Sequence, residues 1–212
     1  MVVIVSVEGN IGSGKSTLIA RLAEYYKDQP GVVCMQEPVD IWSKIADASG
    51  TTILEKFYAD PDKYAFSFQI MAYASRMQAI RAAIDNPATR VIITERCLDT
   101  DRLVFTKMLH DAGRINDIEH QVYLLCFANF TPRTPTSKIV YLQTTPDTCA
   151  ERIVARSRPG EAVISREYLA ACHTYQEDML AMGEVCDTQL VLDGNADLPD
   201  TILAHIAAFI AA

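Results

Sequence analysis

Short, continuous hydrophobic runs alternate along the chain with longer stretches in which hydrophobic residues recur at helical spacing. The first run, Val2–Val7, is rich in β-branched residues and has little polar alternation, which is typical of a strand covered on both faces. Because strand and helix patterns alternate along the sequence, the chain is predicted to form an α/β fold, a five-stranded parallel sheet flanked by helices. Strands are predicted at 2–7, 32–35, 90–94, 139–142 and 190–192, and helices at 61–85, 99–111, 115–129, 146–156, 165–183 and 197–211.

Composition narrows the class of protein. The 212 residues, 50% of them hydrophobic, are enough for one globular domain over residues 1–212, and no repeat interrupts them. The net charge of −8 argues against binding to a nucleic-acid backbone, although a local basic cluster can still hold a small anion. No apolar run reaches the roughly 18–20 residues that span a bilayer, and the first residues lack the basic start of a signal peptide. Six scattered cysteines without a Cys-x-x-Cys pair predict reduced thiols, a cytoplasmic location and no structural zinc.

A glycine-rich segment follows directly after the first predicted strand. Residues 9–16 satisfy the phosphate-loop pattern of a glycine, four residues and Gly-Lys-Ser. Glycines let backbone N–H groups surround an anion, and the helix predicted from Lys15 directs its positive dipole end at the same phosphates. We expect Lys15 to reach the β- and γ-phosphates of ATP and the Ser16 hydroxyl to coordinate Mg²⁺. The predicted cofactor-binding residues of this loop are Gly9, Asn10, Ile11, Gly12, Ser13, Gly14, Lys15, Ser16 and Thr17.

The loop predicts nucleotide binding but does not identify the acceptor of a phosphoryl group. A plain glycine turn between strand and helix is the structural alternative. A GTPase should carry an Asn-Lys-x-Asp guanine reader, which this sequence lacks. Small-molecule kinases therefore remain, with a non-catalytic nucleotide-binding protein as the weaker option.

Carboxylates are predicted at the edge of the sheet where ligands bind in open α/β folds. Glu37 follows the second strand and is suited to accept the proton of a hydroxyl that attacks the γ-phosphate. The alternative is a solvated glutamate before a proline-defined turn. Its neighbour Gln36 is neutral, whereas a nucleoside monophosphate substrate would be better held by a cation there. At the end of the third strand, Glu95 is a candidate for the Mg²⁺ shell and Arg96 for the charge near the reacting oxygen. A weak surface ion pair is the alternative for these two residues.

The long predicted helix at 61–85 carries a stripe suited to a planar base. Gln69, Ala72 or Tyr73, and Arg76 fall on one face, where an amide, a small residue and a guanidinium would lie in line. From spacing alone, a solvent-facing stripe is the more common explanation. If Arg76 is buried, Asp101 is the most suitable partner for its charge.

Three arginines gather at the end of the helix predicted at 146–156. Arg152 and Arg156 are one helical turn apart, and Arg158 follows. Because guanidinium groups match phosphate oxygens, we expect them to act as a lid over the triphosphate, spanning about residues 152–165. A solvated basic face is the alternative.

Together, these motifs resemble the deoxynucleoside kinases related to the deoxycytidine, deoxyguanosine and mitochondrial thymidine kinases. The resemblance runs from about Val3 to about Leu180. It implies a P-loop kinase fold and transfer of the ATP γ-phosphoryl group to the 5′-hydroxyl of a deoxynucleoside, with Glu37 as base and Arg96 beside the 5′-oxygen. It also implies a homodimer. Departures from the family pattern are Cys97 and Leu103, where relatives carry serine and tyrosine, and Pro159-Gly160, where relatives are often acidic.

The resemblance further implies roles for residues that spacing alone would not select. Tyr58 and Glu161 match the pair that binds the sugar 3′-hydroxyl, and Gln69 matches the base-reading glutamine. The predicted substrate-binding residues are Glu37, Trp42, Tyr58, Phe68, Gln69, Ala72, Arg76, Arg96, Asp101, Phe105 and Glu161.

Substrate choice is predicted from one pair of oppositely charged residues. Arg76 with Asp101 resembles the deoxycytidine and deoxyguanosine kinases, whereas thymidine-preferring relatives tend to have apolar residues there. We therefore expect deoxycytidine and purine deoxynucleosides to be preferred over thymidine. The alternatives are a nucleoside-monophosphate kinase of the thymidylate kinase type and a catalytically silent nucleotide-binding regulator.

Overall fold

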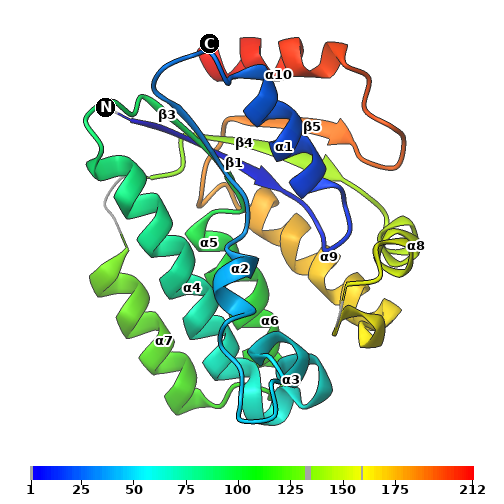
Figure 1. Ribbon diagram of the computed structural model, residues 1–212. Helices are drawn as coiled ribbons and strands as arrows, with labels where there is room; N and C mark the ends of the chain where they lie inside the picture. Colours follow the sequence, from blue (N-terminus) through cyan, green and yellow to red (C-terminus); the bar gives the residue numbers. More distant parts are fainter. Residues whose placement is uncertain (1, 132–134, 159) are drawn as a thin grey trace.

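A parallel sheet forms the centre of the computed structural model, which describes residues 2–131, 135–158 and 160–212 (Figure 1). Within these ranges the sheet has five strands in the order β2-β3-β1-β4-β5, and every neighbouring pair is parallel. The predicted fold class and all five predicted strands are confirmed. The strands are β1 (Val3–Glu8), β2 (Val32–Met35), β3 (Val91–Glu95), β4 (Lys138–Gln143) and β5 (Gln189–Asp193).

Helices cover both faces of the sheet, which explains why the strand sequences are continuously hydrophobic. On one face, Val5 and Val7 pack against α1 (Lys15–Tyr25) and α10 (Thr201–Ala211). On the other face, Ile4 and Ile92 pack against α4 (Pro61–Asp85) and α7 (Asp117–Phe130). Figure 1 shows the resulting three layers, with α1 and α10 above the sheet and α4 and α7 below it.

Two further helical segments cover the lower face of the sheet at β4. Its side chains Ile139 and Tyr141 pack toward α9 (Arg166–Ala181) and a π-helix, η1 (Asp101–Thr106).

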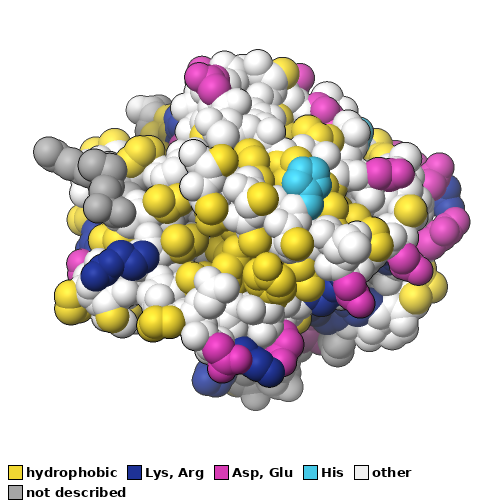
Figure 2. Space-filling view, turned by 90° about the horizontal axis from the view of Figure 1, so that it is seen from above, with side chains coloured by type: hydrophobic (Ala, Val, Ile, Leu, Met, Phe, Trp, Pro, Cys, Tyr) yellow, Lys and Arg dark blue, Asp and Glu magenta, His cyan; other side chains and the backbone are white. Residues whose placement is uncertain are grey.

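Figure 2 looks onto the opposite, upper face, where hydrophobic side chains gather near the centre of the view and most charged side chains lie toward the rim. No helix among the described residues is both long and apolar enough to cross a membrane.

Helices differ from the sequence prediction in three places. The single helix predicted at 99–111 is three consecutive segments, because the π-helix η1 separates α5 (Leu98–Thr100) from α6 (Lys107–Asp111). The short helices α2 (Val39–Trp42) and α3 (Ile53–Ala59) were not predicted, since neither is long enough to show a hydrophobic period. The predicted lid region holds α8 (Pro146–Arg156) and a short 3₁₀ turn, η2 (Glu161–Val163), and its residue 159 lies outside the described residues.

Candidate active site

A cavity of about 430 Å³ lies at the carboxyl edge of the sheet. The P-loop after β1, the segment after β2 and the end of β3 reach it from the sheet, while α3, α4, η1, α9 and the lid region enclose it. All predicted site residues line this cavity except Gly9, Asn10 and Ser13. Residues brought from eight separate segments therefore meet in one place, as expected for the carboxyl edge of a parallel sheet.

Glycines set the shape of the P-loop. Gly9 and Gly12 have φ values of +146° and +81°. A Cβ atom on Gly9 would lie 2.7 Å from the Leu142 carbonyl oxygen, and one on Gly12 would lie 2.6 Å from that of Cys149. Only glycine therefore fits at both positions.

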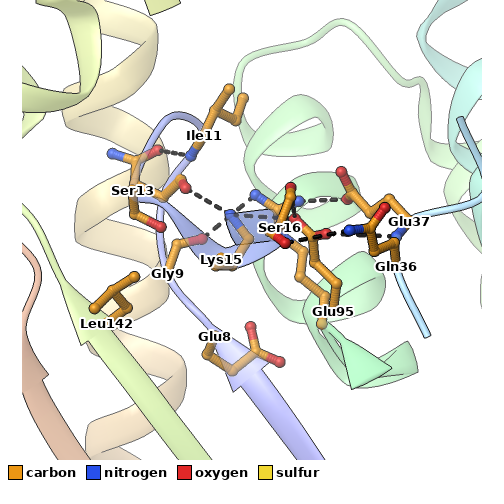
Figure 3. Close-up of polar contacts among 12 residues, drawn as sticks. Glu8, Gly9, Ile11, Ser13, Lys15, Ser16, Gln36, Glu37, Glu95 and Leu142 are labelled. Atoms are coloured by element: carbon orange, nitrogen blue, oxygen red, sulfur yellow. Dashed lines mark hydrogen bonds and ion pairs between the residues drawn. The ribbon is translucent and has the colours of Figure 1, made fainter. Parts of the chain in front are cut away.

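Lys15 and Ser16 occupy the first turn of α1 and face the carboxylate of Glu95 (Figure 3). Lys15 Nζ donates to the Asn10 carbonyl oxygen at 2.7 Å and lies 4.0 Å from Glu95 Oε1. The Ser16 hydroxyl donates to the same Glu95 oxygen at 2.9 Å. Burial and the nearby positive charge of Arg96 lower the pKa of Lys15 to about 8, while Glu95 raises it. A negatively charged phosphate would be a favourable partner for this desolvated ammonium group.

Glu37 is bound by two arginines. Arg96 Nη1 and Arg76 Nη2 both donate to Glu37 Oε1, the latter at 3.3 Å. Burial raises the pKa of Glu37, but the charges of Arg96, Arg76 and Lys15 outweigh it and lower this pKa to about 2. The side chain is only 17% exposed, so the alternative of a solvated glutamate is wrong. The carboxylate is therefore ionised and can accept a proton.

The backbone of Arg96 adopts an uncommon conformation. Its φ is +64°, in the left-handed region, although it is not glycine. The guanidinium lies 4.9 Å from the centre of the Phe105 ring, and Nη2 donates to the Gly9 carbonyl oxygen at 3.4 Å. Its Nε is buried and has no hydrogen-bond partner among the described residues. A strained, buried arginine with a free donor is typical of a residue held for function.

The stripe on α4 points into the cavity rather than into solvent. Gln69, Ala72 and Arg76 are all buried, which rules out the solvent-facing alternative. Tyr73 packs away from the cavity, against Tyr123. Arg76 Nε donates to Asp101 Oδ2 at 2.9 Å, so the pair expected from the sequence forms, with Asp101 supplied by η1.

Aromatic side chains form one wall of the cavity. Phe68 stacks on Phe57 with ring centres 4.6 Å apart, and Trp42 meets the Phe68 ring edge-on at 5.4 Å. The sequence analysis missed three lining residues, namely Leu54, Phe57 and Tyr168. A capping box at Thr52 and Glu55 marks the start of α3, and it could have indicated that this aromatic-rich segment is helical.

The lid arginines make two different sets of contacts. Arg156 and Arg158 donate to the two carboxylate oxygens of Glu161, at 2.5 and 3.0 Å. Arg152 donates instead to the backbone carbonyls of Ser13 and Gly194, at 3.2 and 2.7 Å. All three arginines line the cavity, and the side chains of Arg156 and Arg158 remain 33% and 32% exposed.

Tyr58 lies close to the lid carboxylate. Its pKa is raised by burial and by the negative charge of Glu161. Glu161 itself is 3% exposed. Hence the two residues that the family resemblance pairs around a sugar hydroxyl line one cavity, near enough to interact electrostatically.

Comparison with known proteins agrees with this geometry. A family model described as deoxynucleoside kinase matches residues 5–206. The chain is 31% identical to a protein named probable deoxycytidine kinase from Fowlpox virus, over 97% of this chain and 87% of that protein. It is 34% identical to deoxycytidine kinase 2 of Gallus gallus, over 83% and 73%, and 29% identical to the mitochondrial deoxyguanosine kinase of Xenopus laevis, over 82% and 72%. The chain therefore belongs to the deoxynucleoside kinase family and is an enzyme that uses a nucleotide phosphate donor and a deoxynucleoside acceptor.

Proposed function

We propose that this enzyme transfers the γ-phosphoryl group of ATP to the 5′-hydroxyl of deoxycytidine and of purine deoxynucleosides in preference to thymidine. The observation that carries the proposal is the ionised carboxylate of Glu37, held by Arg96 and Arg76 in the cavity that also contains Lys15. A carboxylate in this setting is suited to remove the proton of an attacking hydroxyl. The 5′-hydroxyl is the group of a deoxynucleoside that this reaction requires.

Positioning and charge are the main contributions that such an active site makes to phosphoryl transfer. Glu37 accepts the proton of the acceptor hydroxyl, and Arg96 holds Glu37 while offering its free Nε to the reacting oxygens. Lys15 offers a positive charge to the phosphates.

Two oxygen-bearing side chains suit a magnesium ion. The Ser16 hydroxyl and the Glu95 carboxylate meet at 2.9 Å, and hard oxygen ligands in small number fit the way Mg²⁺ binds beside nucleotide phosphates. When bound, the ion would neutralise charge on the phosphates. We assign Ser16 and Glu95 to this role.

A second cavity of about 430 Å³ lies on the other side of the P-loop and suits the nucleoside part of the donor. Gly14, Thr17 and Arg152 line both cavities, so a donor could place its phosphates in the loop and its base beyond it. The second cavity is closed by the segment after β5, including Gly194 and Leu198.

The preference among acceptors rests on the buried pair of Arg76 and Asp101. Because the two side chains are 3% and 2% exposed, their hydrogen bonds are little screened by water. A fixed ion pair can orient Gln69 and offer charge-assisted hydrogen bonds to an exocyclic amino or carbonyl group. The names of the relatives, deoxycytidine and deoxyguanosine kinases, support this choice.

A substrate panel tests the proposal. The four deoxynucleosides and their four 5′-monophosphates are each offered with ATP and Mg²⁺, and ADP formation is measured. We expect turnover of deoxycytidine, deoxyadenosine and deoxyguanosine above thymidine, and none of the monophosphates. Thymidine as the best substrate would overturn the base preference. Phosphorylation of monophosphates only would instead favour the monophosphate kinase, and ATP binding without ADP formation would favour a regulator.

Association into a homodimer is the remaining part of the proposal. On α7, the apolar residues Ile118, Val122 and Leu125 recur at helical spacing, and Ile118 and Leu125 are 74% and 64% exposed. Neighbouring exposed side chains of this kind mark an interaction surface. We assign this face of α7 to contact with a second copy of the chain. The cytoplasmic location stays a prediction.

A further inference from the structure

Glu8, the last residue of β1, is a buried carboxylate with no role in the steps above. It is fully buried and directly precedes the first glycine of the P-loop. Three donors converge on its Oε1 atom, namely the Ser6 hydroxyl at 2.6 Å, the Thr100 hydroxyl at 2.7 Å and the Cys97 backbone N–H at 2.9 Å. Burying a carboxylate is costly, so these donors also fix where it lies.

The Glu8 side chain continues the pairing of β1 with β3 beyond the ends of the two strands. The strands pair in parallel as far as Val7 and Glu95. The next backbone N–H, that of Arg96, donates to the Val7 carbonyl oxygen at 3.0 Å. The N–H of Cys97 then finds the Glu8 carboxylate, because the β1 backbone turns into the P-loop at Gly9. The Glu8 carboxylate thus accepts the hydrogen bond of the Cys97 N–H, in the way that the Val7 backbone carbonyl accepts that of the preceding N–H.

This contact affects the backbone conformation of Arg96. Arg96 has a φ of +64°, a conformation that is unfavourable for a non-glycine residue and persists only where the surroundings enforce it. Its N–H is held by Val7 and the following N–H by Glu8. The side chain of Arg96 is thereby directed to Glu37. Without an acceptor at position 8, the Arg96–Cys97 turn is free to relax.

We propose that Glu8 is a positioning residue for phosphoryl transfer, whose carboxylate holds the Arg96–Cys97 turn so that the Arg96 guanidinium contacts Glu37. The inference rests on the proposed function, since it assigns Glu8 to the step in which Glu37 and Arg96 act. Glu8 lines neither cavity, so its effect must pass through other residues.

The test is a double-mutant cycle in the full-length protein. Glu8→Ala, Arg96→Ala and the double variant are compared by steady-state kinetics with deoxycytidine and ATP. A displacement of about 1 Å in a catalytic group can cost ~10²-fold in rate, so we expect a fall in kcat of that order for Glu8→Ala. Because Glu8 acts through Arg96, the double variant should be no slower than Arg96→Ala alone. Additive losses would overturn the proposal.

The double-mutant cycle also separates positioning from loss of folded protein. A smaller folded fraction would lower kcat equally with and without the Arg96 side chain, whereas a positioning effect disappears when Arg96 is absent. Circular dichroism of each variant at the assay temperature gives its folded fraction, and kcat is expressed per folded molecule.

Two further variants and a control complete the design. Glu8→Gln keeps an acceptor oxygen and should recover most of the activity that Glu8→Ala loses. Thr100→Val removes one donor and should lower kcat several-fold, which carries the test if Glu8→Ala fails to fold. Ser137→Ala removes a hydrogen bond to Ile4 N–H near the opposite end of β1 and should leave kcat unchanged. An active wild type with kcat unaltered in Glu8→Ala and in Thr100→Val overturns the role of Glu8 alone. A wild type inactive on every deoxynucleoside overturns the proposed function, and this inference with it.

Discussion

Glu37→Gln is the substitution that most directly tests the proposed chemistry. The amide has nearly the same size and can still accept hydrogen bonds from Arg96 and Arg76, but it cannot take up a proton at neutral pH. Loss of a general base lowers the rate by about 10²–10⁴, which is roughly 3 kcal/mol or more of transition-state free energy. We therefore expect kcat to fall at least ~10²-fold. The affinity for ATP should change little, because the P-loop contacts of Lys15 and Ser16 do not involve Glu37.

The same substitution should also lower the stability of the protein. The Glu37 pKa of about 2, compared with an ordinary 4.5, corresponds to about 3 kcal/mol in favour of the ionised form in the fold. Because the folded-state pKa is depressed, this stabilisation is present above pH 4.5 and is lost as the pH falls toward 2. Glu37→Gln should therefore lower the free energy of unfolding by up to ~3 kcal/mol at pH 7, and the difference from wild type should shrink below pH 4.5.

Three measurements check these expectations together. ADP formation at saturating nucleoside gives kcat, calorimetric titration gives the Kd for ATP, and urea unfolding at pH 7 and pH 4 gives the stability difference. Glu24→Gln is the matched control, since Glu24 is an exposed carboxylate in a surface ion pair with Lys27. Unchanged turnover in Glu37→Gln would remove Glu37 from the mechanism, whatever happens to stability.

Two other predictions follow from the site and from α7. Because the pKa of Lys15 is lowered to about 8, the ammonium group loses its proton as the pH rises through 8, so the affinity for ATP should weaken by up to ~10-fold per pH unit from pH 8 to 9.5. Calorimetric titration across this range should show the slope in wild type and not in Lys15→Met; a flat wild-type profile would contradict it. Leu125→Glu places a charge on the exposed apolar face of α7 and should convert the proposed dimer to a monomer in sedimentation analysis, whereas Glu151→Gln on α8 should leave the mass unchanged. A wild type that sediments as a monomer would refute the assignment of that face.

The sequence predicted what depends on short-range pattern. The strands and the P-loop were recognisable because a continuous β-branched run followed by a glycine-rich loop and Gly-Lys-Ser is both local and specific. The meeting of Glu37, Glu95 and Arg96 could be expected because parallel strands end at one edge. The burial of Gln69 and Arg76 could not be expected from spacing, since an amphipathic stripe looks the same on either face of a helix.

What the sequence did not reveal depends on contacts between distant segments. The π-helix at Asp101–Thr106 interrupts a pattern that reads as ordinary helix, and no local propensity marks it. Phe57 lines the cavity because α3 packs on α4. A helix of seven residues is too short for its hydrophobic periodicity to predict this packing. The left-handed backbone of Arg96 stands beside hydrogen bonds to acceptors on β1 that lie nearly ninety positions earlier in the chain.

Most charged side chains of the cavity form ion pairs within the protein, and this decides how its variants must be compared. Although the chain is acidic overall, the site brings Arg76 and Arg96 onto Glu37 and Asp101, and Arg156 and Arg158 onto Glu161. These charges therefore have fixed partners before any substrate binds, which is the condition for electrostatic preorganisation. Removing one member leaves the charges that it contacted with fewer partners, so a single substitution measures that penalty together with the lost interaction. The contribution of a pair to catalysis follows only when both single variants and the double variant are measured in one cycle.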